Sequence, residues 1–358
     1  VLGGFALRQN RELRAFNPRL LVTLSYFGRD ALITLGADLQ QADYALSSGF
    51  GQQSNEQHQS DAYVQAILPV LRAVDLTLGL RAAHLRNEVL DGNTFAQPTH
   101  FSDDQTAAQF GLAWQLTAGL RLFARYDGNY RYAKVDEFTF TSASPGSNQN
   151  VLKTQEGDSF ETGAEWAGER LSLRAALYRL NNDNEIAFDP NGTGPFGPFG
   201  ANINLPKTRR DGVLARVRWQ AMQRLSLALG GQYVDGEITA GSLQGKRIPL
   251  SASKIGSLSA TLRLPRQLSL FAETQYTGAR AFAGDFDNSL DELPSHAVSN
   301  LALGWDWRAL SLSLRAANLF NREYSEYGAA GFDASFSEAQ AFYPSPERNL
   351  SLSARWDF

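Results

Sequence analysis

Side chains that could bind a metal ion are few and widely separated in this chain. Its four histidines include no pair at the i,i+4 spacing of a helical metal site, and cysteine is absent. Residues 285–291 carry three aspartates and an asparagine, but the glycine and terminal glutamate of a calcium loop are misplaced. The sequence therefore predicts neither a metal site nor a cofactor site.

Catalytic patterns are equally weak. No Ser/His/Asp order, paired-carboxylate spacing or glycine-rich phosphate loop occurs, so the sequence predicts a protein without enzymatic activity. The formal net charge of -4, from 33 basic and 37 acidic residues, leaves no overall basic surface for nucleic acid. Without cysteine there is also no disulfide framework.

Aromatic side chains gather in two polar segments of the chain. Among glycines and prolines, or around the last long polar stretch, they could grip a planar or apolar ligand. They could equally pack the segments against one another. The candidate ligand-binding residues are Phe196, Phe199, Tyr324, Tyr327, Phe332, Phe342 and Tyr343.

Apolar and polar residues alternate with a period of two over much of the chain. At its end, Leu350, Leu352 and Ala354 alternate with Ser351 and Ser353. The same alternation recurs at residues 76–81, 120–127, 171–178, 213–219 and 268–273. Helical spacing is nowhere sustained, and no window approaches the roughly 18 apolar residues of a membrane-spanning helix. The pattern predicts strands.

The connections between these strands alternate in length. Short turns are expected at residues 27–30, 69–73, 116–119, 167–170, 220–224, 264–267 and 307–309. Long polar stretches lie between them, at residues 47–60, 87–103, 134–156, 181–206, 236–254, 279–294 and 327–347. This favours an all-β, transmembrane antiparallel β-barrel with about 16 strands present, short periplasmic turns and long extracellular loops. The first strand is expected at residues 2–8, rising from the short-turn side.

The polar parity of these strands carries many arginines. A dry core could not hold such charges unpaired, so they need water or an occupied lumen. The residues predicted to face the lumen are Arg81, Arg121, Arg125, Arg216, Arg218, Arg315 and Arg355.

Several motifs resemble those of TonB-dependent outer-membrane receptors. Residues 318–324 read Asn-Leu-Phe-Asn-Arg-Glu-Tyr, and a final strand ending in Phe358 follows. Residues 152–156 and 160–166 are similar to the family's "LKPE…E-G-EW" stretch, residues 210–213 to its "R-x-G-V-E" strand start, and residues 245–249 to its "GKRxP" loop.

The resemblance implies that residues 1–358 are the C-terminal part of a bacterial outer-membrane barrel of about 22 strands. The plug domain and the first strands would be absent from this chain. Partners would be outer-membrane lipid, the plug, the TonB energising complex and an imported ligand such as a siderophore-like metal chelate or a corrinoid. The last strand, with Trp356 and Phe358, would carry the membrane-assembly signal.

Two other functions stay open. A free-standing 16-stranded, porin-like diffusion channel would need about this length of chain. A plugless relative could instead be a structural component of a larger surface complex.

Overall fold

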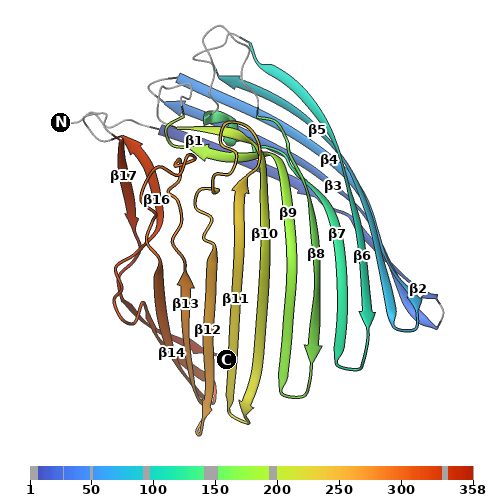
Figure 1. Ribbon diagram of the computed structural model, residues 1–358, viewed down its shortest axis with the longest axis vertical. Helices are drawn as coiled ribbons and strands as arrows, with labels where there is room; N and C mark the ends of the chain where they lie inside the picture. Colours follow the sequence, from blue (N-terminus) through green and yellow to red (C-terminus); the bar gives the residue numbers. More distant parts are fainter. Residues whose placement is uncertain are drawn as a thin grey trace.

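The computed structural model describes residues 7–26, 28–48, 51–91, 97–140, 152–192, 200–332 and 338–357. These residues form a curved 16-stranded antiparallel sheet and a separate hairpin (Figure 1). The sheet comprises β1 (Leu7–Phe16), β2 (Arg19–Tyr26), β3 (Arg29–Ser48), β4 (Gly51–Leu71), β5 (Val74–Asp91), β6 (Thr99–Gln115), β7 (Leu120–Arg131), β8 (Gln155–Ala167), β9 (Leu171–Asp189), β10 (Ala201–Met222), β11 (Leu225–Ile238), β12 (Lys254–Leu264), β13 (Leu268–Thr277), β14 (His296–Trp307), β15 (Leu310–Ala317) and β18 (Asn349–Trp356). The hairpin pairs β16 (Ser325–Phe332) with β17 (Glu338–Pro344), and a short 3₁₀ helix, η1, spans Glu137–Phe140. The predicted all-β fold is confirmed.

Strands that follow one another in the chain are neighbours from β3 to β15, and β18 pairs with β15. Both β1 and β2 pair with β3, and the break between them falls at Asn17 and Pro18, where proline has no N–H for the ladder. Leu7 lies opposite Ser48, at the end of the sheet where the long connections lie. Residues 7 and 8 therefore start a strand that descends from that end, which contradicts the expected rise at these two positions, and the rest of the predicted first strand, residues 2–6, lies outside the described residues.

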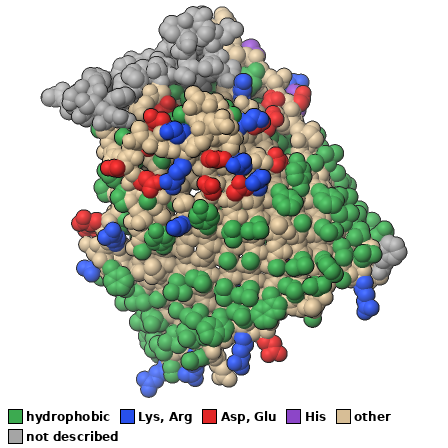
Figure 2. All heavy atoms as spheres, viewed as in Figure 1, with side chains coloured by type: hydrophobic (Ala, Val, Ile, Leu, Met, Phe, Trp, Pro, Cys, Tyr) green, Lys and Arg blue, Asp and Glu red, His purple; other side chains and the backbone are tan. Residues whose placement is uncertain are grey.

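The two faces of the sheet differ as the alternation predicts. The outer face, defined here as the one bearing Leu122, Trp166, Leu173, Trp219 and Leu229, exposes large apolar side chains. Figure 2 shows these side chains over the lower half of one face, with charged side chains gathered above them. The inner face carries the opposite parity and is mostly polar. An apolar exterior around a polar interior is typical of a barrel in lipid.

Charged pairs mark the upper limit of the apolar region on the outer face. Arg179 Nε lies 2.6 Å from Asp211 Oδ1, and Lys207 Nζ lies 3.3 Å from Asp183 Oδ2. The strands are long, with 21 residues in β4 and 22 in β10, whereas a tilted strand crosses a bilayer with about 9–11. Their upper parts therefore extend beyond the lipid-facing band.

This length corrects the expected connections. The predicted polar stretch at residues 47–60 is mostly strand, because β4 starts at Gly51, opposite Ser48. In the upper part of β4 both faces are polar, so the alternation that marks a strand disappears there. The stretch at residues 181–206 is shortened for the same reason, since β9 continues to Asp189 and β10 begins at Ala201.

The described segment that follows β7 folds onto the inner face. We call its residues 132–138 the strap. Val135, which is 1% exposed, packs with Ala42, Tyr44 and Leu46 of β3. A second buried cluster joins the strap to β5 through Ala133, Phe138, Leu152 and Val89. In the part of the chain that the structure describes, no helix has the length and apolar character needed to cross a membrane.

Candidate functional site

A cavity of about 530 Å³ opens on the inner face, beside the strap. Its wall comes from β1, β3, β4, β5, β6 and β7, and from the strap itself. Four cationic side chains border it, Arg11, Arg81, Arg131 and Lys134, together with the phenol of Tyr130. The cavity thus combines charge, amides and aromatic surface, which is the lining expected around a polar ligand of moderate size.

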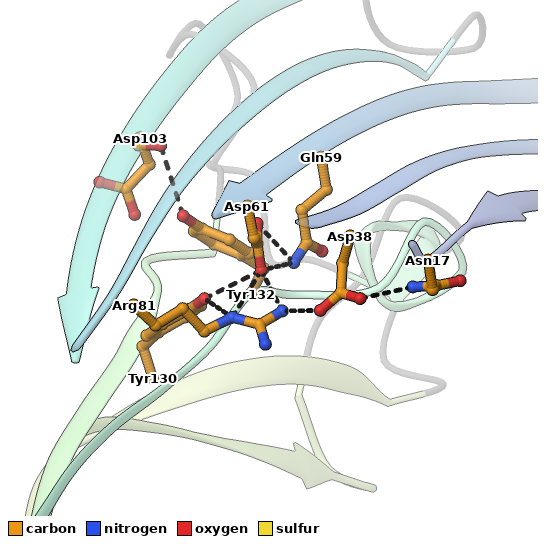
Figure 3. A network of polar contacts seen from close by, with 8 residues as sticks. All are labelled: Asn17, Asp38, Gln59, Asp61, Arg81, Asp103, Tyr130 and Tyr132. Atoms are coloured by element: carbon orange, nitrogen blue, oxygen red, sulfur yellow. Dashed lines mark hydrogen bonds and ion pairs between the residues drawn. The ribbon is translucent and has the colours of Figure 1, made fainter. Parts of the chain in front are cut away.

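Arg81 is the centre of the polar network beside this cavity (Figure 3). Its Nε donates to Asp61 Oδ2 at 2.8 Å and to the Tyr130 hydroxyl at 3.0 Å. Its Nη2 reaches Asp38 Oδ2 at 2.5 Å, and the guanidinium lies 5.3 Å from the centroid of the Tyr63 ring. Strands β3, β4, β5 and β7 each contribute to the network, so one arginine joins four segments of the chain.

The Asp61 side chain is fully buried and has several donors. Gln59 Nε2 donates to its Oδ2 at 2.9 Å, and the Tyr130 hydroxyl donates to the same oxygen at 3.1 Å. Arg81 completes this set. A buried carboxylate is tolerated only when it is paired and hydrogen-bonded in this way.

The network continues at both sides. Asn17 Nδ2 donates to Asp38 Oδ1 at 2.7 Å, next to the break between β1 and β2. The Tyr132 hydroxyl donates to the backbone carbonyl of Asp103 at 3.5 Å. Burial raises the pKa of the Tyr132 hydroxyl, so it stays protonated and keeps its role as donor.

Two other predicted lumen arginines lie in ion pairs on the inner face. Arg121 Nη1 is 3.0 Å from Glu165 Oε2, and Arg125 pairs with Asp127. Arg174, which lies on the same inner parity, pairs with Glu165 and with Glu161 at 2.7 Å. Much of the arginine charge on β5 to β9 is therefore balanced locally.

The remaining predicted arginines are in more open surroundings. Arg216 and Arg218 lie on β10 opposite Gly230 and Ala228, and Arg315 lies opposite Ser351. Within the described ranges these three have no carboxylate at ion-pair distance. Arg355 pairs with Asp357 at 2.9 Å near the short-turn end.

The predicted aromatic residues divide into packed and exposed members. Tyr324 stacks on His296 with 4.6 Å between ring centroids, and Phe342 meets the fully buried Phe282 edge-on at 5.2 Å. Tyr327 and Tyr343 form an edge-on pair at 5.0 Å, with Tyr343 56% exposed. Tyr324, Phe342 and Tyr343 thus each pack against another ring, and Phe342 and Tyr343 keep 50% and 56% of their surface exposed.

Other candidates lie outside what the structure describes. Phe196, Phe199 and Phe358 fall outside the described residues, and Phe332 is described by its backbone alone, which pairs with Glu338 in the hairpin. Trp356 is described: it lies on β18 opposite Leu310 and is 55% exposed.

Three histidines lie at the upper end of the outer face, each beside a carboxylate. The pairs are His58 with Glu56 at 2.8 Å, His84 with Asp104 at 2.7 Å and His100 with Glu88 at 3.4 Å. Among the residues that the structure describes, no three His, Asp or Glu side chains are grouped so as to hold a metal ion.

Sequence reasoning missed the residues that carry the network. Asp61, Gln59 and Tyr130 were not singled out, although Asp61 and Gln59 share the inner parity with Gln57 and Gln65 in β4. That run of polar residues at every second position was the available signal. The strap gave no such signal, since nothing in its composition shows that it folds inward.

Comparison with known proteins identifies the family of this chain. The family model for the TonB-dependent receptor-like β-barrel matches residues 4–319. The chain belongs to this family. Barrels of the family lie in the bacterial outer membrane, and its members are transporters and not enzymes.

Solved structures agree on the fold. The ferric yersiniabactin uptake receptor FyuA from Yersinia pestis is 18% identical with a TM-score of 0.78, covering 99% of this chain and 56% of that one. The copper transporter OprC is 16% identical with a TM-score of 0.79, covering 98% and 58%. The ferric-catecholate import receptor Fiu from K12 E. coli is 17% identical with a TM-score of 0.75, covering 98% and 55%. The chain thus spans little more than half the length of these structures. No curated protein sequence matches it significantly.

Proposed function

We propose that the chain is the larger, C-terminal part of the barrel of a receptor that imports a metal chelate, such as a ferric siderophore, or a corrinoid. The observation that carries the proposal is the cavity of about 530 Å³ bordered by Arg11, Arg81, Arg131 and Lys134 on the inner face of a TonB-dependent receptor barrel. Its cations and the donors around it suit a ligand rich in oxygen atoms. The names of similar structures, which are ferric chelate receptors and a copper transporter, support the same ligand class.

The remaining strands and the plug are part of this proposal. Within the described residues, β18 pairs on one side alone, with β15, and β1 and β2 pair with β3 alone. Unpaired strand edges are unfavourable in lipid because their backbone groups have no water to bond. Further strands of the same receptor would therefore close the barrel between β18 and β1, and a plug domain would fill it and engage the TonB complex. Residues 1–358 would then be wall and extracellular connections.

An uptake assay tests the function. Iron-limited cells that depend on this receptor are given radioactive iron as ferric citrate, a ferric trihydroxamate or a ferric tricatecholate, and in a parallel assay radioactive cyanocobalamin as a corrinoid. Uptake of at least one probe should require the receptor and stop when the membrane energy supply is removed. Uptake of none of them, together with steady passage of small solutes, would favour the porin-like channel instead.

A matched pair of variants links uptake to the cavity. Lys134→Ala removes a cation from the cavity wall, whereas Lys254→Ala removes an exposed cation from the upper outer face. Loss of one charged hydrogen bond to the ligand should raise the KM for uptake by about tenfold in Lys134→Ala. Lys254→Ala should transport like the parent protein.

A further inference from the structure

The inner face of β4 carries an uninterrupted column of polar side chains. Amides occupy four successive inner positions, Gln53, Asn55, Gln57 and Gln59, and Asp61 follows them. Successive members of such a column are about 7 Å apart, since a strand rises about 3.4 Å per residue. The column runs from the end with the long connections down to the Arg81 network, and the cavity borders it at Gln57 and Gln59.

The strap covers the upper part of this column. Gln57 Nε2 donates to the backbone carbonyl of Ala133 at 2.8 Å, and Asn55 Nδ2 donates to that of Val135. Val135 also fills an apolar niche on β3, where it is 1% exposed. These contacts act together with the second buried cluster, in which Ala133 and Phe138 pack with Val89, and with the bond of 2.6 Å from Asn202 Nδ2 to the backbone carbonyl of Glu137. Opening the strap therefore means breaking a small number of hydrogen bonds and two apolar contacts.

The covered amides are incompletely bonded in this arrangement. Asn87 of β5 lies opposite Gln57 and is 4% exposed, yet among the residues that the structure describes neither atom of its amide has a hydrogen-bond partner. The Asn55 Oδ1 atom is buried without a partner as well. Buried polar atoms are nearly always bonded, because leaving them unpaired is costly. If the strap covered these positions permanently, we would expect apolar side chains in place of Asn55 and Asn87.

We propose that the amide column of β4, with Asn87 beside it, is a hydrogen-bonding track for the ligand, and that the strap covers its upper end reversibly. The proposal rests on the import function proposed above. Amides donate and accept, so the track suits a ligand whose surface is rich in hydroxyl and carbonyl oxygens. Its amides are neutral and select little for net charge, and Arg81 at its lower end is already paired with Asp61 and Asp38.

Thiol labelling in intact cells tests whether the strap moves. The chain has no cysteine, so one introduced cysteine is its single thiol. Asn87→Cys reports the covered position, and Gln40→Cys reports an uncovered one on the cavity wall. A membrane-impermeant methanethiosulfonate should label Asn87→Cys to completion, but at least about tenfold more slowly than Gln40→Cys. Adding Gln57→Leu, which removes the donor to Ala133, should speed labelling at Asn87→Cys.

Two results would contradict the proposal that the strap moves. Equal labelling rates at the two positions would mean that the strap covers nothing. No labelling of Asn87→Cys over hours, in protein that still migrates as the folded form on unheated gels, would mean that the strap is a fixed wall.

Uptake tests the track itself. Gln59→Leu should slow uptake of whichever ferric probe is imported by about fivefold, the effect of one lost hydrogen bond. Gln41→Leu makes the same change on the outer face of β3 and should leave uptake unchanged. Equal uptake by both variants would overturn the track while the import function stands. Uptake of no probe by the parent protein would overturn the import function and the track together, and labelling would still decide whether the strap moves.

Discussion

The buried carboxylate of Asp61 should make Arg81 the most costly ion-pair partner to remove among the lumen arginines. The Asp61 side chain is 0% exposed, and Arg81 supplies its only cation within the ion pairs of the described residues. Arg81→Leu would leave a buried charge bonded to Gln59 and Tyr130 alone. The expected result is a clear loss in the free energy of unfolding.

The magnitude follows from burial. Removing one partner of a buried ion pair costs about 3–5 kcal/mol. Arg81 is 34% exposed, and two neutral donors stay on Asp61, so the expected loss is about 2–3 kcal/mol. Replacing both partners, in Arg81→Leu/Asp61→Leu, removes the fully buried charge, and Asp38, which is 16% exposed, keeps its bond from Asn17, so the double variant should regain most of that loss and lie within about 1 kcal/mol of the parent.

Urea unfolding of the barrel in detergent micelles, followed by circular dichroism and gel mobility, measures these differences. Arg179→Leu is the control, since its ion pair with Asp211 is 55% and 38% exposed and should contribute at most about 1 kcal/mol. Equal losses for Arg81→Leu and Arg179→Leu would refute the reasoning. So would a double variant that is as unstable as Arg81→Leu alone.

Four further outcomes are expected. A membrane-impermeant maleimide added to intact cells should label Gln244→Cys, in the long connection after β11, whereas Arg224→Cys, in a short turn, should react only after permeabilisation; the reverse pattern would invert the topology. Phe358→Ala should lower the amount of inserted barrel well below that of Leu352→Ala, and equal amounts would make Phe358 an ordinary lipid-facing residue. Phe342→Ala should make the β16–β17 hairpin sensitive to protease because it uncovers Phe282, whereas Tyr343→Ala should weaken uptake alone. In planar bilayers the complete receptor should show almost no steady conductance and a plug-deleted form a large one; stable conductance in both would support the porin-like channel.

The strands within the apolar band could be predicted from the sequence, because the alternation of apolar and polar residues is a local property of each strand. Within the apolar band each strand meets lipid on one side and polar surroundings on the other, as Leu350 and Ser351 show. Where β4 rises above that band both of its sides are polar. This is why residues 51–60, which are strand, were expected to be a loop.

The site could be predicted only in part, because its residues meet through long-range pairing. Arg81 stood out as a charge on the inner parity, but its partners lie 20, 43 and 49 positions away, in Asp61, Asp38 and Tyr130. The inward fold of the strap depends on a niche formed by Ala42, Tyr44 and Leu46, and no local pattern in residues 132–138 encodes it.

The length of the strands also determines what the cell presents to its surroundings. With 21 residues, β4 is about 70 Å long and, at a tilt of roughly 40°, rises about 50 Å, about twice the height of the apolar band. The upper part of the wall thus extends well above the lipid. Antibodies and other large molecules that approach from the medium can therefore contact the sides of these strands as well as the connections at their upper ends. The paired charges of Arg179 and Asp211 lie on this side surface. Hydrogen-bonded strands tolerate fewer sequence changes than loops do. The sides of the upper strands are therefore the better target for a binder that must recognise many variants of this receptor.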